Sequence, residues 1–206
     1  MKPRPWDIFY EEKLKELFAH SKTVVDIGGG LRVRKEKNNR YDPNSEWLRP
    51  LIDAVDYKVL DPVPDYHPDI IGDIHELPFP DNSIDAIICK AVLEHVKNPF
   101  KAVDEMHRVL KPGGYCFVFV PFLYYYHPMK GYYGDYWRFT SDGMQELFKR
   151  FSRIEICNVR GAIESLVHLS PLGRYKSINS FGRFLDGLFH KTKTEQTAGF
   201  HLLAIK

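Results

Sequence analysis

The stretch TVVDIGGG at residues 23–30 decides the fold class, because a short apolar run ends directly in three glycines. The apolar run predicts a buried strand, and glycines after such a strand let a ligand approach the backbone without a Cβ in the way. If a helix follows, its N-terminal amides favour an anionic group. Position 33 is Val33, so the G-x-G-x-x-G fingerprint of a dinucleotide site is incomplete. A tight turn is the alternative explanation of the glycines.

Strand and helix patterns alternate on either side of this stretch. Apolar runs predict further strands at residues 57–61, 70–71, 84–89, 115–120, 153–159 and 199–205. Helical spacing predicts an N-terminal helix over residues 1–20, with Ile8 and Leu14 on its apolar face. A second helix begins at Asn98, carries Phe100 on its apolar face and ends at the turn formed by residues 111–114.

The central strands are continuous apolar runs, which is typical of a mostly parallel sheet covered on both faces. We therefore predict an α/β fold: a Rossmann-like, doubly wound, mostly parallel seven-stranded sheet with an antiparallel last strand and helices on both faces. Ligands of such sheets bind at the carboxyl ends of the strands, near the topological switch point. The loops after the strands are accordingly where we expect the chemistry.

Length and composition favour an ordinary globular protein with one domain, residues 1–206. The formal net charge is +2, from 29 basic and 27 acidic residues, so we expect no nucleic-acid partner. Cys89, Cys116 and Cys157 each lie in an apolar run, which predicts free thiols in a reducing compartment and no metal site. There is no apolar run of the ~20 residues that a membrane span needs, and the start MKPRPWDIFYEEKLKEL lacks the apolar core of a signal peptide. We expect a cytoplasmic protein.

Two acidic residues follow the next strands. Asp61 ends the run at residues 57–61, where a carboxylate can accept hydrogen bonds from both ribose hydroxyls of an adenosine. Asp73 in Gly72-Asp73-Ile74 can accept from an adenine amino group while Ile74 packs on the ring. A turn-forming aspartate is the alternative for each. Acceptors after three successive strands, in this order, favour an adenosine ligand.

Four segments in order resemble the class I S-adenosylmethionine-dependent methyltransferases, and within them the type 11 methyltransferase domains. These segments are Val24-Val-Asp-Ile-Gly-Gly-Gly30, Gly72-Asp-Ile-His-Glu-Leu-Pro-Phe-Pro-Asp81, Val92-Leu-Glu-His-Val96 and Arg108-Val-Leu-Lys-Pro-Gly-Gly114. The resemblance covers roughly residues 20 to 150. It implies S-adenosylmethionine as cofactor and S-adenosylhomocysteine as product.

The resemblance also implies which residues contact the cofactor. They are Asp26, Gly28, Gly29 and Gly30 for the methionine part, Asp61 and Pro62 for the ribose, Asp73 and Ile74 for the adenine, and Lys90 and Ala91 for the backbone beside the sulfonium. The sequence departs from the family pattern twice. Arg32 stands where another glycine is common, and the segment after Leu31 is not a clean helical pattern.

The acceptor side is expected in residues 121–140, an unusually aromatic loop after the fifth strand. Histidine titrates near neutral pH, so His127 is the first candidate base, and His95 is a second residue at the methyl-transfer edge. A turn histidine before Pro128 and a lid that packs only on its own protein are the alternatives. The predicted substrate-binding residues are Tyr126, Tyr133, Asp135, Trp137 and Arg138. Asp135 and Arg138 can instead simply pair with each other.

We predict a methyltransferase acting on an oxygen or nitrogen atom of a small-molecule or saccharide acceptor. One alternative is a non-catalytic cofactor-binding or scaffolding protein with the same fold, and another is a nicotinamide-dependent oxidoreductase. Residues 161–193 have an ambiguous pattern, for which an acceptor cap, a homodimer surface and a mobile segment are open explanations.

Overall fold

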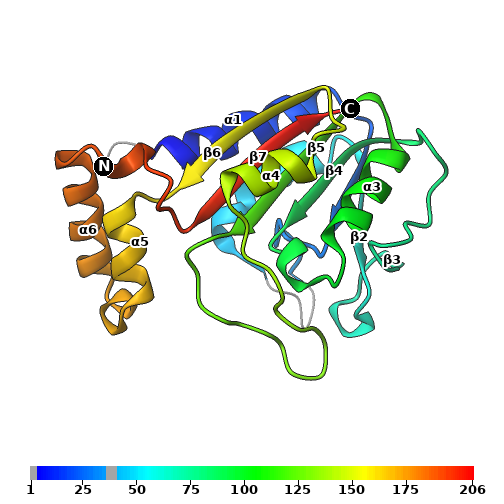
Figure 1. The fold of residues 1–206 in the computed structure, drawn as a ribbon. Helices are drawn as coiled ribbons and strands as arrows, with labels where there is room; N and C mark the ends of the chain where they lie inside the picture. The colour runs from blue at the N-terminus through cyan, green and yellow to red at the C-terminus, as the bar shows by residue number, and fades with distance from the viewer. Residues whose placement is uncertain (1–3, 36–40) are drawn as a thin grey trace.

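The computed structural model describes residues 4–35 and 41–206, and these contain a seven-stranded sheet with helices packed along it (Figure 1). Residues 1–3 of the expected N-terminal helix, and residues 36–40 of the irregular segment after Leu31, lie outside this description. The strands are β1 (Thr23–Ile27), β2 (Asp56–Asp61), β3 (Ile70–Ile71), β4 (Ile84–Lys90), β5 (Leu110–Pro121), β6 (Arg153–Val159) and β7 (Gly199–Ile205). The helices are α1 (Pro5–Ala19), α2 (Arg49–Ile52), α3 (Pro99–Val109), α4 (Ser141–Leu147), α5 (Ala162–Leu169) and α6 (Lys176–Leu188). Short 3-10 helices are η1 (Pro43–Leu48), η2 (Pro64–Tyr66), η3 (Leu93–His95), η4 (Pro171–Arg174) and η5 (Lys191–Lys193).

The sheet order places the switch point at β1. The strands lie in the order β3-β2-β1-β4-β5-β7-β6, and only β7 runs antiparallel to its neighbours. β1 pairs with β2 on one side and β4 on the other, so the direction in which strands are added reverses there. A ligand crevice is expected beyond the carboxyl ends of β1 and β4. The predicted fold class is confirmed.

Each face of the sheet buries a different set of helices. Val24 packs in one apolar cluster with Leu14 of α1, whereas the adjacent Val25 packs in another with Met106 of α3. Neighbouring side chains of a strand point to opposite faces, so a continuous apolar run is needed where both faces are covered. The apolar runs read from the sequence thus reflect burial on both sides.

Three local expectations were wrong. Ile8 and Phe100 are 39% and 57% exposed, because each lies beside rather than on the buried stripe of its helix. Trp6 and Ala102 are buried in α1 and α3 instead. The residues 111–114, expected to form a turn, lie inside β5, whose pairing with β4 shifts register near its start.

The segment between β6 and β7 forms a helical pair, α5 and α6, that stands beyond the end of the sheet (Figure 1). The buried Asp186 of α6 accepts hydrogen bonds from the backbone N–H groups of Ile163 and Glu164, each at 2.8 Å. It therefore satisfies free donors at the N-terminus of α5. Arg183 of α6 pairs with Glu164 of α5 at 2.6 Å, so side chains of α6 hold both the end and the side of α5.

The cysteines and helices also bear on the compositional expectations. Cys89 and Cys116 are buried, Cys157 is half-buried, and all three are free thiols, as predicted. Among the described helices, none is both long enough and apolar enough to cross a lipid bilayer.

Candidate active site

A cavity of about 390 Å³ opens beyond the carboxyl ends of β1, β2 and β4. Its wall includes Gly28 after β1, Asp61 at the end of β2, Asp73 in the loop after β3 and Ala91 after β4. A volume of this size is typical of pockets for small ligands. The fold thus brings the four loops singled out in the sequence to one space at the switch point.

Asp26 lies beneath the glycine loop and outside the cavity wall. Its carboxylate accepts hydrogen bonds from the backbone N–H groups of Gly30 and Leu31, each at 3.0 Å, and from the hydroxyl of Tyr57 at 2.6 Å. Burial raises the pKa of Asp26, and these three donors oppose that effect. The contacts give Asp26 the role of holding the loop in shape. Gly29 and Gly30 also lie outside the cavity wall.

Gly28 is the glycine that the cavity exposes, and its backbone is left-handed with φ +78°. A Cβ at this position would lie 2.5 Å from Cγ2 of Val92, closer than side chains tolerate. Gly28 is therefore required both for its backbone conformation and for the close approach of β1 to the loop after β4. Beyond this loop the expected irregularity is present: no helix begins in residues 31–35, and Arg32 itself is left-handed at φ +55°.

Replacing Gly28 with alanine is expected to lower the free energy of unfolding by about 2–4 kcal/mol, from the left-handed backbone and the clash together. Gly113→Ala is a matched control, because Gly113 has φ +77° but open space where the Cβ would stand. We expect Gly113→Ala to show the backbone cost alone, about 1–2 kcal/mol. Urea unfolding of both variants measures the difference. Equal losses of unfolding free energy in Gly28→Ala and Gly113→Ala would show that the clash with Val92 does not destabilise the protein.

The two acidic residues of the wall occupy turns. Oδ1 of the buried Asp61 accepts from the backbone N–H of Val63 at 2.8 Å. Oδ1 of Asp73 accepts from the backbone N–H of His75 at 2.9 Å and contacts its Nδ1 at 2.6 Å. The turn-forming alternatives are thus present in both cases, and each is compatible with a ligand because a carboxylate accepts several hydrogen bonds. Pro62 and the buried Ile74 add apolar wall beside them.

At the end of β4, the backbone of Ala91 and the side chain of Lys90 face different parts of the molecule. Ala91 is left-handed at φ +54°, and its N–H donates to the carbonyl of Phe119 at 2.9 Å. Residues other than glycine rarely adopt this left-handed conformation, and backbone strain of this kind is concentrated at functional sites. Lys90 lies outside the cavity wall and directs its Nζ to the hydroxyl of Tyr10 at 2.9 Å. Ala91 therefore offers backbone to the cavity, and the ammonium of Lys90 faces α1.

A second cavity of about 290 Å³ adjoins the first, and the two share Ala91, His95 and Tyr133. Its wall is built by η3, the end of β5, the aromatic loop and the end of β6. Tyr124 and His127 reach it from the aromatic loop. Two cavities that share wall residues can hold two ligands next to each other.

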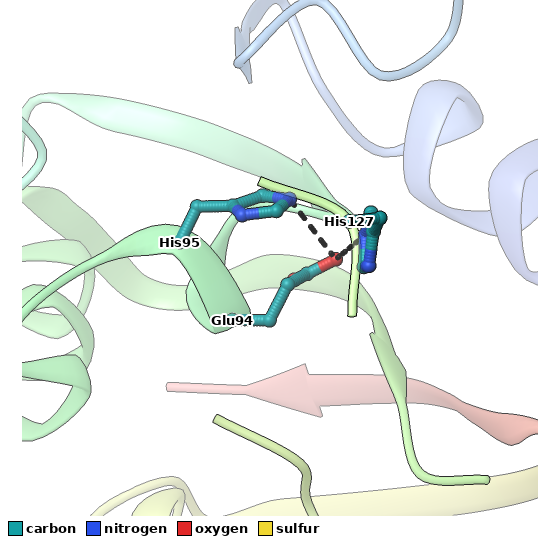
Figure 2. Close-up of side chains that lie close together, drawn as sticks. All are labelled: Glu94, His95 and His127. Atoms are coloured by element: carbon teal, nitrogen blue, oxygen red, sulfur yellow. Dashed lines mark ion pairs between the residues drawn. The ribbon is translucent and has the colours of Figure 1, made fainter. Parts of the chain in front are cut away.

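Three polar side chains converge in the second cavity (Figure 2). Oε1 of Glu94 lies 3.8 Å from Nε2 of His95 and 3.9 Å from Nε2 of His127. Glu94 is 1% exposed, and burial raises its pKa to about 8. Its Oε2 has no hydrogen-bond partner among the described residues. The predicted catalytic histidines, which are 32 positions apart in the sequence, thus face each other across a buried carboxyl group.

The predicted substrate residues fall into three groups. Tyr133 lines both cavities. Tyr126 is 75% exposed and, like Trp137, which donates to the carbonyl of Val96 at 2.8 Å, lines neither cavity. Arg138 donates hydrogen bonds to both carboxylate oxygens of Asp135, at 2.6 and 2.8 Å. The structure therefore has these two residues paired with each other, which was the alternative to substrate contact. Arg138 also lowers the pKa of Asp135 to about 2.

Sequence reasoning missed several residues of the second cavity. Arg160 follows β6 and Arg32 follows the glycine loop, and both line the wall together with Tyr124. Position after a predicted strand was the available signal for Arg160. Glu94 precedes His95 in the sequence, but nothing local in the sequence indicates that its side chain is buried next to both histidines.

Residues 14–118 match the sequence model of the methyltransferase domain family, which is more than half of the chain. The chain belongs to this family. Curated relatives match shorter segments. An uncharacterized methyltransferase of Schizosaccharomyces pombe is 49% identical over 45 residues, which are 22% of this chain and 16% of that protein. A demethylmenaquinone methyltransferase of Renibacterium salmoninarum is 53% identical over 45 residues, 22% of this chain and 19% of that protein. This methyltransferase-domain chain therefore matches less than a fifth of either relative's length.

Solved structures agree in fold. A crystal structure of an S-adenosylmethionine-dependent methyltransferase from Archaeoglobus fulgidus aligns with a TM-score of 0.60 over 99% of this chain and 95% of the other, at 12% identity. The family match confirms the expected methyltransferase domain, and this alignment confirms the expected fold. The alternative function, a nicotinamide-dependent oxidoreductase, is accordingly disfavoured.

Proposed function

We propose that this methyltransferase transfers the methyl group of S-adenosylmethionine to an oxygen or nitrogen atom of a small-molecule or saccharide acceptor. The observation that carries the proposal is the junction of two cavities at Ala91, His95 and Tyr133. The first cavity has predicted cofactor residues in its wall, and the second has both predicted catalytic histidines. A donor and an acceptor bound in these spaces would meet at the junction, and such alignment is the main requirement of an in-line transfer.

The first cavity suits the cofactor by the chemistry of its wall. When bound, S-adenosylmethionine supplies an electrophilic methyl group on its sulfonium. Asp61 is proposed to accept hydrogen bonds from the ribose hydroxyls, and Asp73 from the adenine amino group. Ile74 provides apolar contact for the adenine ring, and Gly28 lets the methionine part lie against the backbone. Asp26 supports this arrangement by holding the glycine loop from below.

The second cavity suits a polar, oxygen-rich acceptor. Tyr124 and Tyr133 offer flat apolar faces with hydroxyl groups, which suit a sugar or an aromatic ring. Arg32 and Arg160 line the same wall. Because burial raises the pKa of Glu94 to about 8, its carboxyl group is mostly uncharged at neutral pH and does not neutralise these two guanidinium groups. Nε of Arg160 lies 3.9 Å from Oε1 of Glu164, so Arg160 is partly paired, and the two guanidinium groups together favour an anionic group. His95 and His127 are the proposed catalytic residues, since an acceptor that keeps its proton near neutral pH needs help to lose it.

Methyl transfer is tested with a labelled S-methyl group and a pool of saccharide and phenolic metabolites. Formation of S-adenosylhomocysteine with label on an acceptor oxygen or nitrogen is expected. Label on carbon, the transfer named for a ubiquinone/menaquinone biosynthesis C-methyltransferase of Coxiella burnetii, would overturn the proposed acceptor atom. Cofactor binding without turnover in any pool would instead favour the non-catalytic cofactor-binding or scaffolding alternative.

We further propose that residues 1–206 act as one domain and that the segment 161–193 is a homodimer surface. The segment is preceded by β6 and followed by β7, and β7 pairs with both β5 and β6. Strands of one sheet therefore flank the segment in the chain. The helical pair α5 and α6 exposes a group of large apolar side chains, which are Leu166, Phe181, Phe184 and Leu188, each more than half exposed. Apolar patches of this kind mark interaction surfaces.

The homodimer is tested by light scattering coupled to size-exclusion chromatography. We expect a dimer for the wild type and a monomer for Phe184→Asp, because a charge cannot be buried unpaired in an apolar interface. Ile71→Asp is the matched control, since Ile71 is 63% exposed, as Phe184 is, but lies in β3 at the opposite edge of the sheet. A wild-type monomer at all concentrations would overturn the homodimer surface and leave the acceptor cap and the mobile segment as explanations.

A further inference from the structure

We propose that Glu94, His95 and His127 bind a divalent transition-metal ion in the second cavity. One ligand atom from each residue lies within 4.8 Å of the other two, and Figure 2 shows both imidazoles directed at the same carboxylate oxygen. Binding of the ion stands on this geometry. Its part in catalysis, to hold an acceptor oxygen, rests on the function proposed above.

The hydrogen bonds of the two histidines leave the correct nitrogen available. Nδ1 of His95 lies 2.7 Å from the carbonyl oxygen of Gly134, and Nδ1 of His127 lies 2.9 Å from that of Tyr125. A carbonyl oxygen only accepts, so each Nδ1 carries the hydrogen and each neutral ring keeps a lone pair on Nε2. Both Nε2 atoms face Glu94. Metal-binding histidines are typically oriented by such a bond from the other ring nitrogen.

Without a cation, the cluster has too few donors. Two Nε2 lone pairs and a carboxyl group face one another at 3.8 and 3.9 Å, which is beyond hydrogen-bond distance. Oε2 of Glu94 is buried and lacks a partner among the described residues, an arrangement that is costly unless something satisfies it. A bound cation would accept lone pairs from both Nε2 atoms and from Oε1 of Glu94, and Glu94 would release its proton on binding.

The spacing requires little movement. A tetrahedral ion with bonds of about 2.1 Å places its ligand atoms about 3.4 Å apart. The two distances from Glu94 to the histidines, 3.8 and 3.9 Å, exceed the bound spacing by about 0.4–0.5 Å, and the ligand atoms of the two histidines lie within 4.8 Å of each other. Side-chain rotations that draw the two imidazoles together would complete the site. Two imidazoles and one carboxylate favour Mn²⁺, Fe²⁺, Co²⁺ or Zn²⁺ over Mg²⁺ or Ca²⁺.

We assign Asp135 the role of positioning His127 in this site. Its Oδ2 accepts the backbone N–H of His127 at 2.7 Å and lies 3.2 Å from Nδ1 of the same ring. Arg138 in turn fixes Asp135 through both carboxylate oxygens. The paired residues predicted to contact substrate thus orient a proposed metal ligand.

Three protein ligands leave coordination positions open toward the cavity, where an acceptor hydroxyl can bind. A hydroxyl held by a divalent ion would lose its proton more easily, and we assign that proton to solvent water. The acceptor oxygen would then bond to the methyl carbon while the bond from that carbon to the sulfonium sulfur breaks, and its electron pair would stay on sulfur as S-adenosylhomocysteine leaves. This site departs from the absence of metal expected from the cysteine pattern. The cysteines are irrelevant to it, because its ligands are histidine and glutamate.

Titration of chelator-treated protein with Co²⁺, followed by visible absorption, tests the site without any acceptor. One ion per chain is expected for the wild type, and Glu94→Gln and His127→Ala are expected to lower the affinity at least about 100-fold. His107→Gln is the control, because His107 packs on Phe151 and lines neither cavity, and its affinity should match the wild type. Asp135→Asn is expected to lower Co²⁺ affinity about 10–100-fold. Calorimetry with S-adenosylmethionine verifies that each variant keeps the first cavity.

Absence of Co²⁺ binding by the wild type, or equal binding by wild type and the ligand variants, would overturn the site. Either result leaves the proposed methyl transfer standing, since the titration contains no acceptor. Conversely, turnover that is unchanged after removal of metal by EDTA would overturn the catalytic part alone.

Discussion

Replacing His127 with alanine is expected to lower kcat by about 10²–10⁴-fold, the usual contribution of a side chain that assists a proton transfer. S-Adenosylmethionine affinity should stay essentially unchanged, because His127 lines the second cavity and not the first. The reason is the same whether the imidazole acts on the acceptor proton itself or through a bound cation: one of the two rings facing the acceptor is lost. Release of S-adenosylhomocysteine measures kcat, and calorimetry measures cofactor affinity.

His107→Ala serves as the control for this experiment, since it removes an imidazole from α3 outside both cavities. Its turnover should match that of the wild type. Equal loss of cofactor binding and turnover in His127→Ala would contradict a catalytic role, because it would place the defect in the fold of the aromatic loop.

Replacing Asp61 is expected to weaken S-adenosylmethionine binding by about 1–3 kcal/mol, the cost of leaving ribose hydroxyls without their acceptor. This corresponds to about 5–150-fold in Kd. Asp61→Ala also removes the acceptor for the N–H of Val63, so Asp61→Asn is the sharper variant. Its side-chain oxygen can keep that turn, while the charge and the second acceptor oxygen are lost. Calorimetric titration with S-adenosylmethionine and S-adenosylhomocysteine measures both variants.

Asp104→Asn is the matched control for Asp61, because Asp104 pairs with Arg150 on the surface and lines neither cavity. We expect its cofactor affinity to equal that of the wild type. If Asp61→Asn binds as the wild type does and only Asp61→Ala is weakened, the turn rather than the ribose contact explains the loss.

Much of the fold was predictable because the deciding signals are local. Apolar runs indicated all seven strands, since strands buried on both faces must be apolar throughout. The order of loops carrying Gly28, Asp61 and Asp73 was enough to expect a site at the carboxyl ends of β1, β2 and β3, and the cavity wall includes all three residues. Arg32 shows the limit of residue matching: it replaces a common glycine and still adopts the left-handed backbone that glycine favours.

Side-chain direction was the part that local pattern left open. Lys90 ends β4 and Ala91 follows it, yet the ammonium of Lys90 reaches Tyr10 of α1 while the backbone of Ala91 lines the cavity. Asp135 and Arg138 were candidates for substrate contact, and their mutual ion pair was one of two explanations. Choosing between such explanations requires knowing which partner is nearer in space.

Periodicity and loop chemistry along the chain therefore predicted the sheet and the edge of the sheet at which the cavity lies, and the resemblance of four segments predicted the family. Only the tertiary structure brought Glu94 of η3, His127 of the aromatic loop and Arg160 after β6 around one second cavity. The physical reason is that a strand or helix pattern reports burial over neighbouring residues, whereas a cluster of ligands or bases depends on contacts between segments far apart in the chain. The close approach of Glu94 to both histidines is set by how the loop after β5 folds back over η3, and no spacing in the sequence encodes it.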